Sequence, residues 1–260
     1  NTLSDQDNYK YIESVIDIDN FIDFQIAEIY STNIDWPANN FKFWRSREPG
    51  GKWRWILFDL DTGFGLWDEW WAYGRPGYEH NHVAHATNED SYGNSEEGWP
   101  NPGWSTYIFR MFLNNDDFKN KFINRFADYL NTRFSPQNAL NTVSKFESGI
   151  KSAMPAHVER WGYYTENNTQ EIVKVKTFAQ RRPAVIKQHL ITHFNLGGKA
   201  AITVKREPEG SGIIKLNSLL LDHDSWQGEY FIGAPVTLSA NPAPGYKFVQ
   251  WLGASESGKT

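Results

Sequence analysis

The sequence predicts an α+β fold in which a mainly helical domain carries one β-hairpin and is followed by a small all-β module. Three observations predict it. Apolar residues recur with helical spacing over much of residues 1–198, and two alternating runs flank a turn near residue 50. Short alternating runs separated by Gly, Pro and Asn occupy residues 199–260 and stop in a polar tail, so we expect an incomplete module. We therefore divide the chain into residues 1–198 and 199–260.

The first predicted helix begins near Asp19 and ends near Thr32. Either Asp19 or Asn20 can cap its start, and Pro37 lies among the turn-forming residues that end it. Its wide apolar face consists of Phe21, Ile22, Phe24, Ile26, Ala27, Ile29 and Tyr30. The polar residues 1–18 before it predict no regular element.

Two alternating runs, NFKFWR at residues 40–45 and KWRWILF at residues 52–58, predict the two strands of a hairpin. The sequence EPGG at residues 48–51 is a strong turn signal between them. Alternation places Phe41 and Phe43 on one face of the first strand. The chain enters this hairpin from a loop that contains Asp35 and leaves it at Asp59.

The rest of the chain predicts a long loop, four helices and several short strands. Residues 60–103 are rich in Gly, Trp, Asn and Pro, and a loop of that length is usually functional. Helical patterns cover about 104–114, 116–132, 136–153 and 169–194, and residues 195–198 end the last helix. Strands are expected within 200–207, 212–218, 228–242 and 245–253, with Tyr246, Phe248 and Trp251 in the core of the module.

Composition excludes several classes of function. The 260 residues contain 26 Lys and Arg against 31 Asp and Glu, a net charge of −5, so no basic footprint for nucleic acid is present. The chain has no cysteine, which excludes disulfides, thiolate metal sites and a cysteine nucleophile. No apolar run reaches the length of a membrane span. Aromatic residues make up 16% of the chain, and we expect most of them to pack in the core.

The order of polar residues around the hairpin suggests a site for phosphate chemistry. Asp35 follows a helix, Asn40 comes five residues later, and Asp59 follows the hairpin. Protein kinases use this layout, with a loop Asp for the acceptor hydroxyl and an Asn and a second Asp for Mg²⁺. Mg²⁺ takes hard oxygen ligands and usually only one or two protein carboxylates. Asn39 is an alternative to Asn40, and Asp61 is an alternative or additional ligand beside Asp59.

The same residues resemble a known family. The segments FIDFQIAEIYSTNIDWPANNFKFWR and GGKWRWILFDLDTGFG, with HVERWG at 157–162 and FAQRRPAVIKQHLITHF at 178–194, are similar to the CotH kinase family, related to spore coat protein H. The resemblance covers roughly residues 8–195. It implies a lower-lobe, protein-kinase-like fold that uses ATP and Mg²⁺, or Mn²⁺ or Ca²⁺, to phosphorylate Ser or Thr of proteins. By motif match, Asp35 would be catalytic, and Asn40 and Asp59 would bind the metal with help from Asp61.

One departure from this pattern concerns the nucleotide-binding upper lobe. No Gly-rich loop precedes the first predicted helix, and Lys10 is the only lysine before Asp19. We therefore expect a fragment of a longer protein, with weak or no kinase activity alone. The β module resembles the InlB B-repeat type of bacterial surface proteins. Together with the Cys-free composition, it suggests a secreted or cell-surface bacterial protein.

Other interpretations remain open at this point. Asp35 could simply stabilise a turn, and the segment at 59–63 fails the template of an EF-hand calcium loop. His80, His82 and His85 could bind zinc, although an exposed polar loop is the simpler expectation. The main alternative function is a non-catalytic bacterial surface or adhesion protein that binds a glycan or a protein through a kinase-like scaffold. A metal-dependent phosphoester hydrolase is a further possibility.

Overall fold

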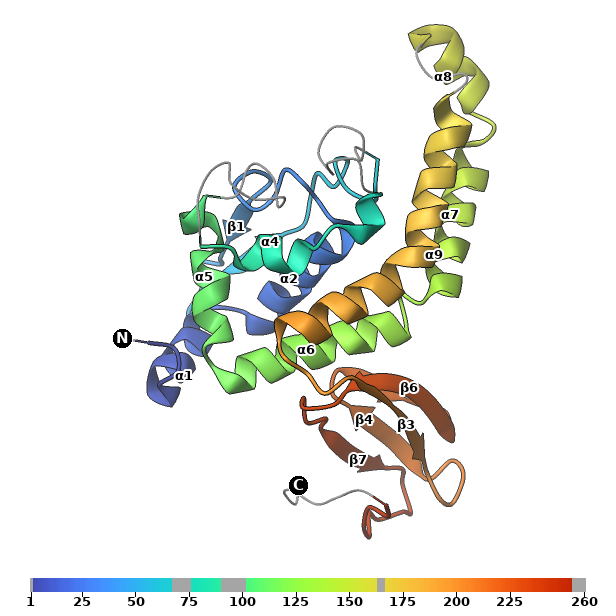
Figure 1. The fold of residues 1–260 in the computed structure, drawn as a ribbon. Helices are drawn as coiled ribbons and strands as arrows, with labels where there is room; N and C mark the ends of the chain where they lie inside the picture. Colours follow the sequence, from blue (N-terminus) through green and yellow to red (C-terminus); the bar gives the residue numbers. More distant parts are fainter. Residues whose placement is uncertain (1, 67–75, 90–101, 163–166, 254–260) are drawn as a thin grey trace.

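The computed structural model describes residues 2–66, 76–89, 102–162 and 167–253, without the side chains of 167–169. Of the described residues, 48% are helical and 16% lie in strands, which agrees with the predicted α+β class. A helical body lies at the centre, a helical arm projects from it, and a β module lies on the other side of the body (Figure 1). The elements are α1 (Gln6–Val15), α2 (Ile18–Ser31), β1 (Lys42–Trp44), β2 (Arg54–Ile56), η1 (Gly77–Glu79), α4 (His82–Thr87), α5 (Gly103–Leu113), α6 (Asp116–Asn131), α7 (Pro136–Ile150), α8 (Met154–Trp161), α9 (Asn167–His193), β3 (Lys199–Lys205), β4 (Gly212–Leu216), β5 (Leu219–Leu221), β6 (Ser225–Phe231) and β7 (Leu238–Pro242).

Helix α2 is the central element of the body. Its predicted range is confirmed, but its N-cap is Asp17 rather than Asp19 or Asn20, because the helix begins at Ile18 and the Asp17 carboxylate accepts a hydrogen bond from the backbone N–H of Asn20 at 3.1 Å. The helix is buried on most of its circumference and packs against β2, α4 and α6. The C-terminal end of α2, at Thr32, is therefore held in place by the elements packed around the helix.

Aromatic rings fill the core around α2, as the composition predicts. The Phe21 ring lies 4.6 Å from that of Trp55 and 5.1 Å from that of Phe112, which in turn stacks on Phe118 at 4.7 Å. Burying each such side chain stabilises the fold by roughly 1.5–3 kcal/mol. Helix α6 is also tied to α2 by Arg125, whose guanidinium donates to both carboxylate oxygens of Asp23 at 2.7 Å.

The prediction that residues 1–18 are irregular was wrong. Helix α1 is capped by Asp5, whose carboxylate accepts from the backbone N–H of Asp7 and of Asn8. After α1 the chain runs beside the hairpin: the N–H of Asp17 donates to the carbonyl of Trp53 at 2.9 Å, and the N–H of Trp53 donates to the carbonyl of Val15 at 2.8 Å. The hairpin is thereby fixed to the start of α2.

The predicted hairpin is confirmed, with strands of three residues each. β1 and β2 pair antiparallel with Phe43 opposite Trp55, so both rings lie on the same face, 6.1 Å apart. The side chain of Asn20 holds β2 through both of its amide atoms, because it accepts from the Trp55 N–H at 2.6 Å and donates to the Trp55 carbonyl at 3.2 Å. Arg54 points to the other face and pairs with Asp17 at 3.4 Å.

The segment at 60–103 is not the continuous loop that the sequence predicts. In its described part it contains η1 and the six-residue helix α4, which packs against α2, α5 and α9. Trp67, Trp70, Trp71, Tyr73 and Trp99 lie outside the described residues. The sequence pattern could not show α4, because so short a helix has less than two turns of periodicity.

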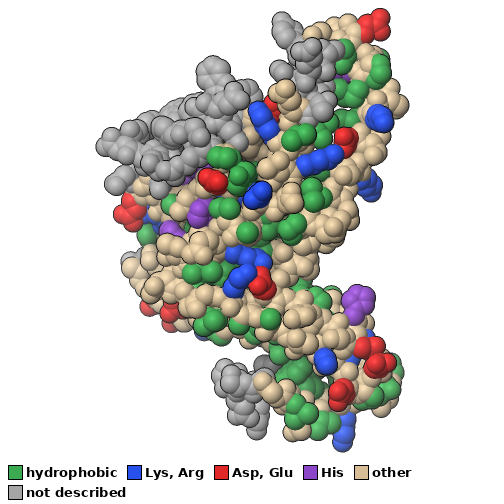
Figure 2. All heavy atoms as spheres, turned by 45° about the vertical axis from the view of Figure 1, so that its right-hand side comes forward, with side chains coloured by type: hydrophobic (Ala, Val, Ile, Leu, Met, Phe, Trp, Pro, Cys, Tyr) green, Lys and Arg blue, Asp and Glu red, His purple; other side chains and the backbone are tan. Residues whose placement is uncertain are grey.

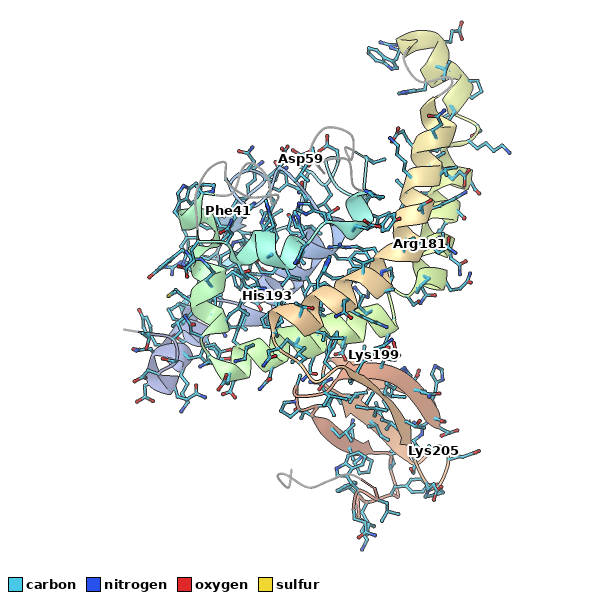
Figure 3. All side chains as sticks on the ribbon, in the orientation of Figure 1. Phe41, Asp59, Arg181, His193, Lys199 and Lys205 are labelled. Carbon is cyan, nitrogen blue, oxygen red and sulfur yellow. The ribbon has the colours of Figure 1, made fainter. Side chains whose placement is uncertain are left out.

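Helices α7, α8 and the first part of α9 form the arm. Neither α7 nor α8 contains a buried residue, and Lys176 of α9 pairs with Glu147 of α7 at 2.6 Å. In Figure 2 hydrophobic side chains along the arm alternate with Lys and Arg side chains. Helix α9 contains Pro183 and changes direction near Arg181 (Figure 3). No helix in the described ranges is both long and apolar enough to cross a membrane.

The β module begins at Lys199 and is attached to α6. It contains a two-stranded sheet, β3–β6, and a three-stranded sheet in the order β5–β4–β7. The buried carboxylate of Asp128 in α6 accepts from the N–H and hydroxyl of Ser218 at 2.9 and 2.5 Å and from the hydroxyl of Tyr230 at 2.6 Å. The strand predicted within 245–253 is absent from the structure, and Tyr246 and Phe248 are exposed rather than in a core.

Candidate functional site

The loop between α2 and the hairpin carries Asp35, the predicted catalytic residue. Asp35 is half-buried, and the next residue, Trp36, is 2% exposed and anchors the loop against Phe24 of α2 at 6.4 Å between ring centroids. The peptide between Trp36 and Pro37 is cis. Because Trp36 is buried, the Asp35 carboxylate is carried on a loop with a fixed core contact rather than on a free turn.

Helix α4 holds this loop from the other side through two histidines. A ring N–H of His82 donates to the carbonyl of Asn33 at 2.9 Å, and a ring N–H of His85 donates to the carbonyl of Trp36 at 2.7 Å. The two rings stack with centroids 4.3 Å apart. Burial, followed by the neighbouring His85 and His80 and by Arg182, lowers the pKa of His82 well below its usual value, so it is neutral near pH 7.

The sequence left His80, His82 and His85 as either a zinc site or an exposed polar loop, and neither interpretation holds in the described structure. His82 and His85 are buried in α4, where their ring nitrogens bond to backbone carbonyls. Among the described residues, no group of three or more His, Asp or Glu side chains is arranged to hold a metal ion. The two buried histidines instead support the Asp35 loop.

The hairpin brings Asn40 and Asp59 together at its open end. The amide nitrogen of Asn40 donates to the backbone carbonyl of Asp59 at 3.1 Å, across 19 residues of sequence. Figure 3 shows Asp59 at the end of the body opposite Lys199, where the β module begins. The pairing of β1 with β2 and this side-chain bond together fix the open end of the hairpin. Asn40 and Asp59 are therefore held at a constant separation.

The turn after Asp59 packs directly on the end of α2. The N–H of Phe64 donates to the carbonyl of Ser31 at 2.7 Å. At Gly63 a Cβ atom would lie 3.0 Å from that same carbonyl oxygen, so the close approach needs glycine there. The segment that contains Asp59 and Asp61 is therefore fixed to the helix that precedes the Asp35 loop.

Several residues with strained backbone conformations lie where the end of α2, the Asp35 loop and the open end of the hairpin meet; we call this region the junction. Thr32, Asn40, Asp59 and Phe64 have φ of 56°, 55°, 58° and 58°, and they are four of the six non-glycine residues with positive φ in the described chain. Asn and Asp tolerate this conformation, but a β-branched Thr or a Phe adopts it only when its surroundings impose it. Such strained positions are concentrated at functional sites in proteins.

The carboxylates of this junction act on one another. Burial first, and then the negative charges of Asp61 and Asp59, raise the pKa of Asp35 above its usual value. The three acidic residues, predicted from sequence spacing, therefore share one electrostatic environment. A cation bound among them would relieve their mutual repulsion.

The donor set fits a hard divalent cation with few protein ligands. The described side chains form no cage of three carboxylates. An amide oxygen from Asn40 and a carboxylate from Asp59 or Asp61, completed by water and phosphate oxygens, is a ligand set that suits Mg²⁺ or Mn²⁺. The described side chains therefore fit a cation with few protein ligands better than a structural metal centre.

Two buried groups near the site were missed in the sequence. Asn33 is fully buried and hydrogen bonds to Glu28, Asp59 and Thr62. Burial raises the pKa of Glu28 to about 8, against a smaller opposite effect of its bond to Asn33. Two features of the sequence could have pointed to them: Asn33 lies two residues before Asp35, and Glu28 is a single acidic residue on the buried side of an apolar helix.

The helical pattern at 169–194 favours a position on the helix surface for Arg182, and this expectation is wrong. The structure buries it completely, and its guanidinium donates to the carbonyls of Ile29, Tyr30, Tyr78 and His80 at 2.7–3.1 Å. Ile29 and Tyr30 lie in the last turn of α2, where a cation is favoured by the helix dipole. Burial lowers the pKa of Arg182 to about 9. Arg182 thus ties α9 and η1 to the base of the Asp35 loop.

The fold and site define an α+β protein with an acidic junction between a helix end and a hairpin. The family described as CotH kinase protein matches residues 1–186 of the 260. The chain therefore belongs to the CotH kinase protein family and is a kinase-like protein, as its motifs suggested. Searches of curated proteins and of solved structures gave no match. The match ends before the β module begins, so the resemblance of the module to the InlB B-repeat stays a prediction, as does the division at residues 198 and 199.

Proposed function

We propose that this chain carries the metal-binding and acceptor-binding part of an atypical protein kinase, which transfers the γ-phosphoryl group of ATP to Ser or Thr hydroxyls of a protein. The observation that supports the proposal best is the junction of Asp35, Asn40 and Asp59, where a hairpin end and a helix end are joined by hydrogen bonds. Membership of the CotH kinase protein family supports the same reaction class.

In the proposed reaction Asp35 orients the acceptor hydroxyl and takes its proton as the oxygen forms a bond to the γ-phosphorus, while ADP leaves with the electrons of the broken P–O bond. A raised pKa makes Asp35 a stronger base, because proton transfer improves as its pKa approaches that of the medium. Asn40, Asp59 and Asp61 would hold a divalent cation. That cation would supply charge neutralisation for the phosphate oxygens. The aromatic core beneath the loop keeps these groups from moving apart.

The test is transfer of labelled phosphate from [γ-³²P]ATP by the full product of the gene, with Mg²⁺ or Mn²⁺ and a Ser/Thr-rich acceptor protein. We expect Asp35→Asn and Asp59→Asn to lower kcat/KM by about a hundredfold or more, because each removes a group that acts on the transition state. Asp7→Asn, at an exposed position in α1, is the matched control and should have no effect. Unchanged transfer by Asp35→Asn would refute the role of this site, and absence of transfer by the wild type would refute the proposal as a whole and favour a non-catalytic surface or adhesion protein.

A further inference from the structure

We propose that Asn33 is a positioning residue that sets the separation of Asp35 and Asp59. The effect of Asn33 on phosphoryl transfer rests on the proposed function, whereas its hydrogen bonds to the two loops do not. Asn33 lies in the loop directly after α2 and is 0% exposed. Because its side chain is fully buried, it would act through the residues that it holds.

Each polar side-chain atom of Asn33 bonds to two partners. The amide nitrogen donates to a carboxylate oxygen of Glu28 at 2.9 Å and to the carbonyl of Asp59 at 3.3 Å. The amide oxygen accepts from the Thr62 hydroxyl at 2.6 Å and from the N–H of Asp35 at 3.3 Å. One side chain thus joins α2, the Asp35 loop and the turn after the hairpin.

The backbone of Asn33 is occupied as well. Its N–H donates to the carbonyl of Glu28 at 3.3 Å, and its carbonyl accepts from the ring of His82 at 2.9 Å. With two donors and two acceptor positions, an amide is the only side-chain group of this size that can make all four side-chain bonds. Asp would lack the donors, and Gln would need another loop geometry.

The partner at the hairpin end is held in a strained conformation. Asp59 has a φ of 58°, and its carbonyl accepts from two amides, that of Asn33 and that of Asn40. These two bonds restrict the rotation of the Asp59 backbone, so its side chain keeps one direction relative to Asp35. Removing one of the two amides would allow Asp59 to relax from this conformation.

Glu28, in α2, accepts one of the hydrogen bonds of the Asn33 side chain. Its second carboxyl oxygen is buried without a hydrogen-bond partner in the described structure, so its bond to Asn33 lies in an apolar environment, where hydrogen bonds are strong. Glu28→Gln keeps an acceptor for Asn33. That substitution should therefore leave the junction intact.

The test uses five variants of the full chain, one of which, Glu28→Gln, enters only in the second readout. Asn33→Ala removes all four side-chain bonds. Thr62→Val removes only the hydroxyl that donates to Asn33, while Thr62→Ser keeps a hydroxyl, so this pair decides the question if Asn33→Ala does not fold. Asn114→Asp, at the exposed end of α5, is the control.

The first readout is hydrogen exchange of peptides covering residues 34–41 and 60–66, with α6 as the internal reference. We expect Asn33→Ala to raise exchange in both peptides by about tenfold or more and to leave α6 unchanged. Thr62→Val should raise it by a smaller factor, and Thr62→Ser should restore it. A change in only one of the two peptides, or an equal change in α6, would overturn the proposal.

The second readout is binding of Mn²⁺, followed by electron paramagnetic resonance without nucleotide. We expect Asn33→Ala to weaken Mn²⁺ binding by about tenfold, because the ligands lose their fixed separation, and Glu28→Gln to leave it unchanged. Equal Mn²⁺ affinity in Asn33→Ala and wild type would refute the positioning role. If the wild type binds no Mn²⁺ even after a non-hydrolysable ATP analogue is added, the proposed function fails, while the exchange result still decides the role of Asn33.

Discussion

Glu28→Gln tests whether a neutral carboxylic acid lies beneath the Asp35 loop. Glu28 is 0% exposed, and burial raises its pKa from 4.5 to about 8. Between these two values the folded state binds one proton more than the unfolded state, so stability is greatest at low pH and is lost as pH rises. The slope is about −1.4 kcal/mol per pH unit, and the whole effect is of order 5 kcal/mol between pH 4.5 and 8. That is a large part of the stability of an ordinary domain, about 5–15 kcal/mol.

The assay is denaturant unfolding of wild type and Glu28→Gln at intervals from pH 5 to pH 9. Other titrating groups contribute equally to both proteins, so the difference in unfolding free energy isolates Glu28. We expect wild type to lose stability relative to Glu28→Gln as pH rises. Glu48→Gln, at an exposed position outside the site, is the control for the substitution itself. Parallel pH profiles for wild type and Glu28→Gln would refute the reasoning, as would the absence at pH 7 of an infrared band from a protonated carboxyl that Glu28→Gln removes.

Three further substitutions test the supports of the site. Arg182→Lys should lower the free energy of unfolding, measured with denaturant, by about 2–4 kcal/mol, because an ammonium cannot bond to all four carbonyls that the guanidinium contacts. An unchanged free energy of unfolding would contradict that role. Asp128→Ala should cost about 2–4 kcal/mol and speed hydrogen exchange in β4 and β6, because donors of the β module lose their buried acceptor; slow exchange there would contradict the attachment to α6. The pKa of His82 is lowered in the folded state, so below about pH 6.5 the unfolded state binds more protons and the wild type loses stability as pH falls. His82→Gln should lose less stability over the same pH range. Identical unfolding free energies against pH for the two proteins would contradict this role of His82.

Elements with strong periodicity could be predicted from the sequence. α2, α6 and the hairpin combine a clear apolar pattern with cap or turn residues, and the structure confirms them. Helix α1 was missed because it has only ten residues, is polar on average, and has Tyr9 as its single fully buried residue. The strand predicted within 245–253 alternates correctly but has no partner in the described chain, and alternation without pairing does not make a strand.

The site could be predicted only in part, for a physical reason. The spacing of Asp35, Asn40 and Asp59 around a hairpin indicates that they meet, because a hairpin returns the chain to its starting point. The four bonds of the Arg182 guanidinium go to backbone carbonyls distant in sequence, which leave no residue pattern. The Asn33 side chain reaches the Asp59 carbonyl and the Thr62 hydroxyl across 26 and 29 residues, and no spacing rule indicates such partners. The roles of Asp35, Asn40, Asp59 and Asp61 in catalysis and metal binding stay predictions.

The most direct test of the account is a crystal structure of the protein soaked with Mn²⁺ and a non-hydrolysable ATP analogue, in which anomalous scattering locates the cation. The account predicts an anomalous peak about 2.2 Å from a carboxylate oxygen of Asp59 and from the amide oxygen of Asn40, with phosphate oxygens among its other ligands. An Mn²⁺ ion bound elsewhere, or a site without cation at saturating Mn²⁺ and nucleotide, would contradict the assignment of this junction to phosphoryl transfer.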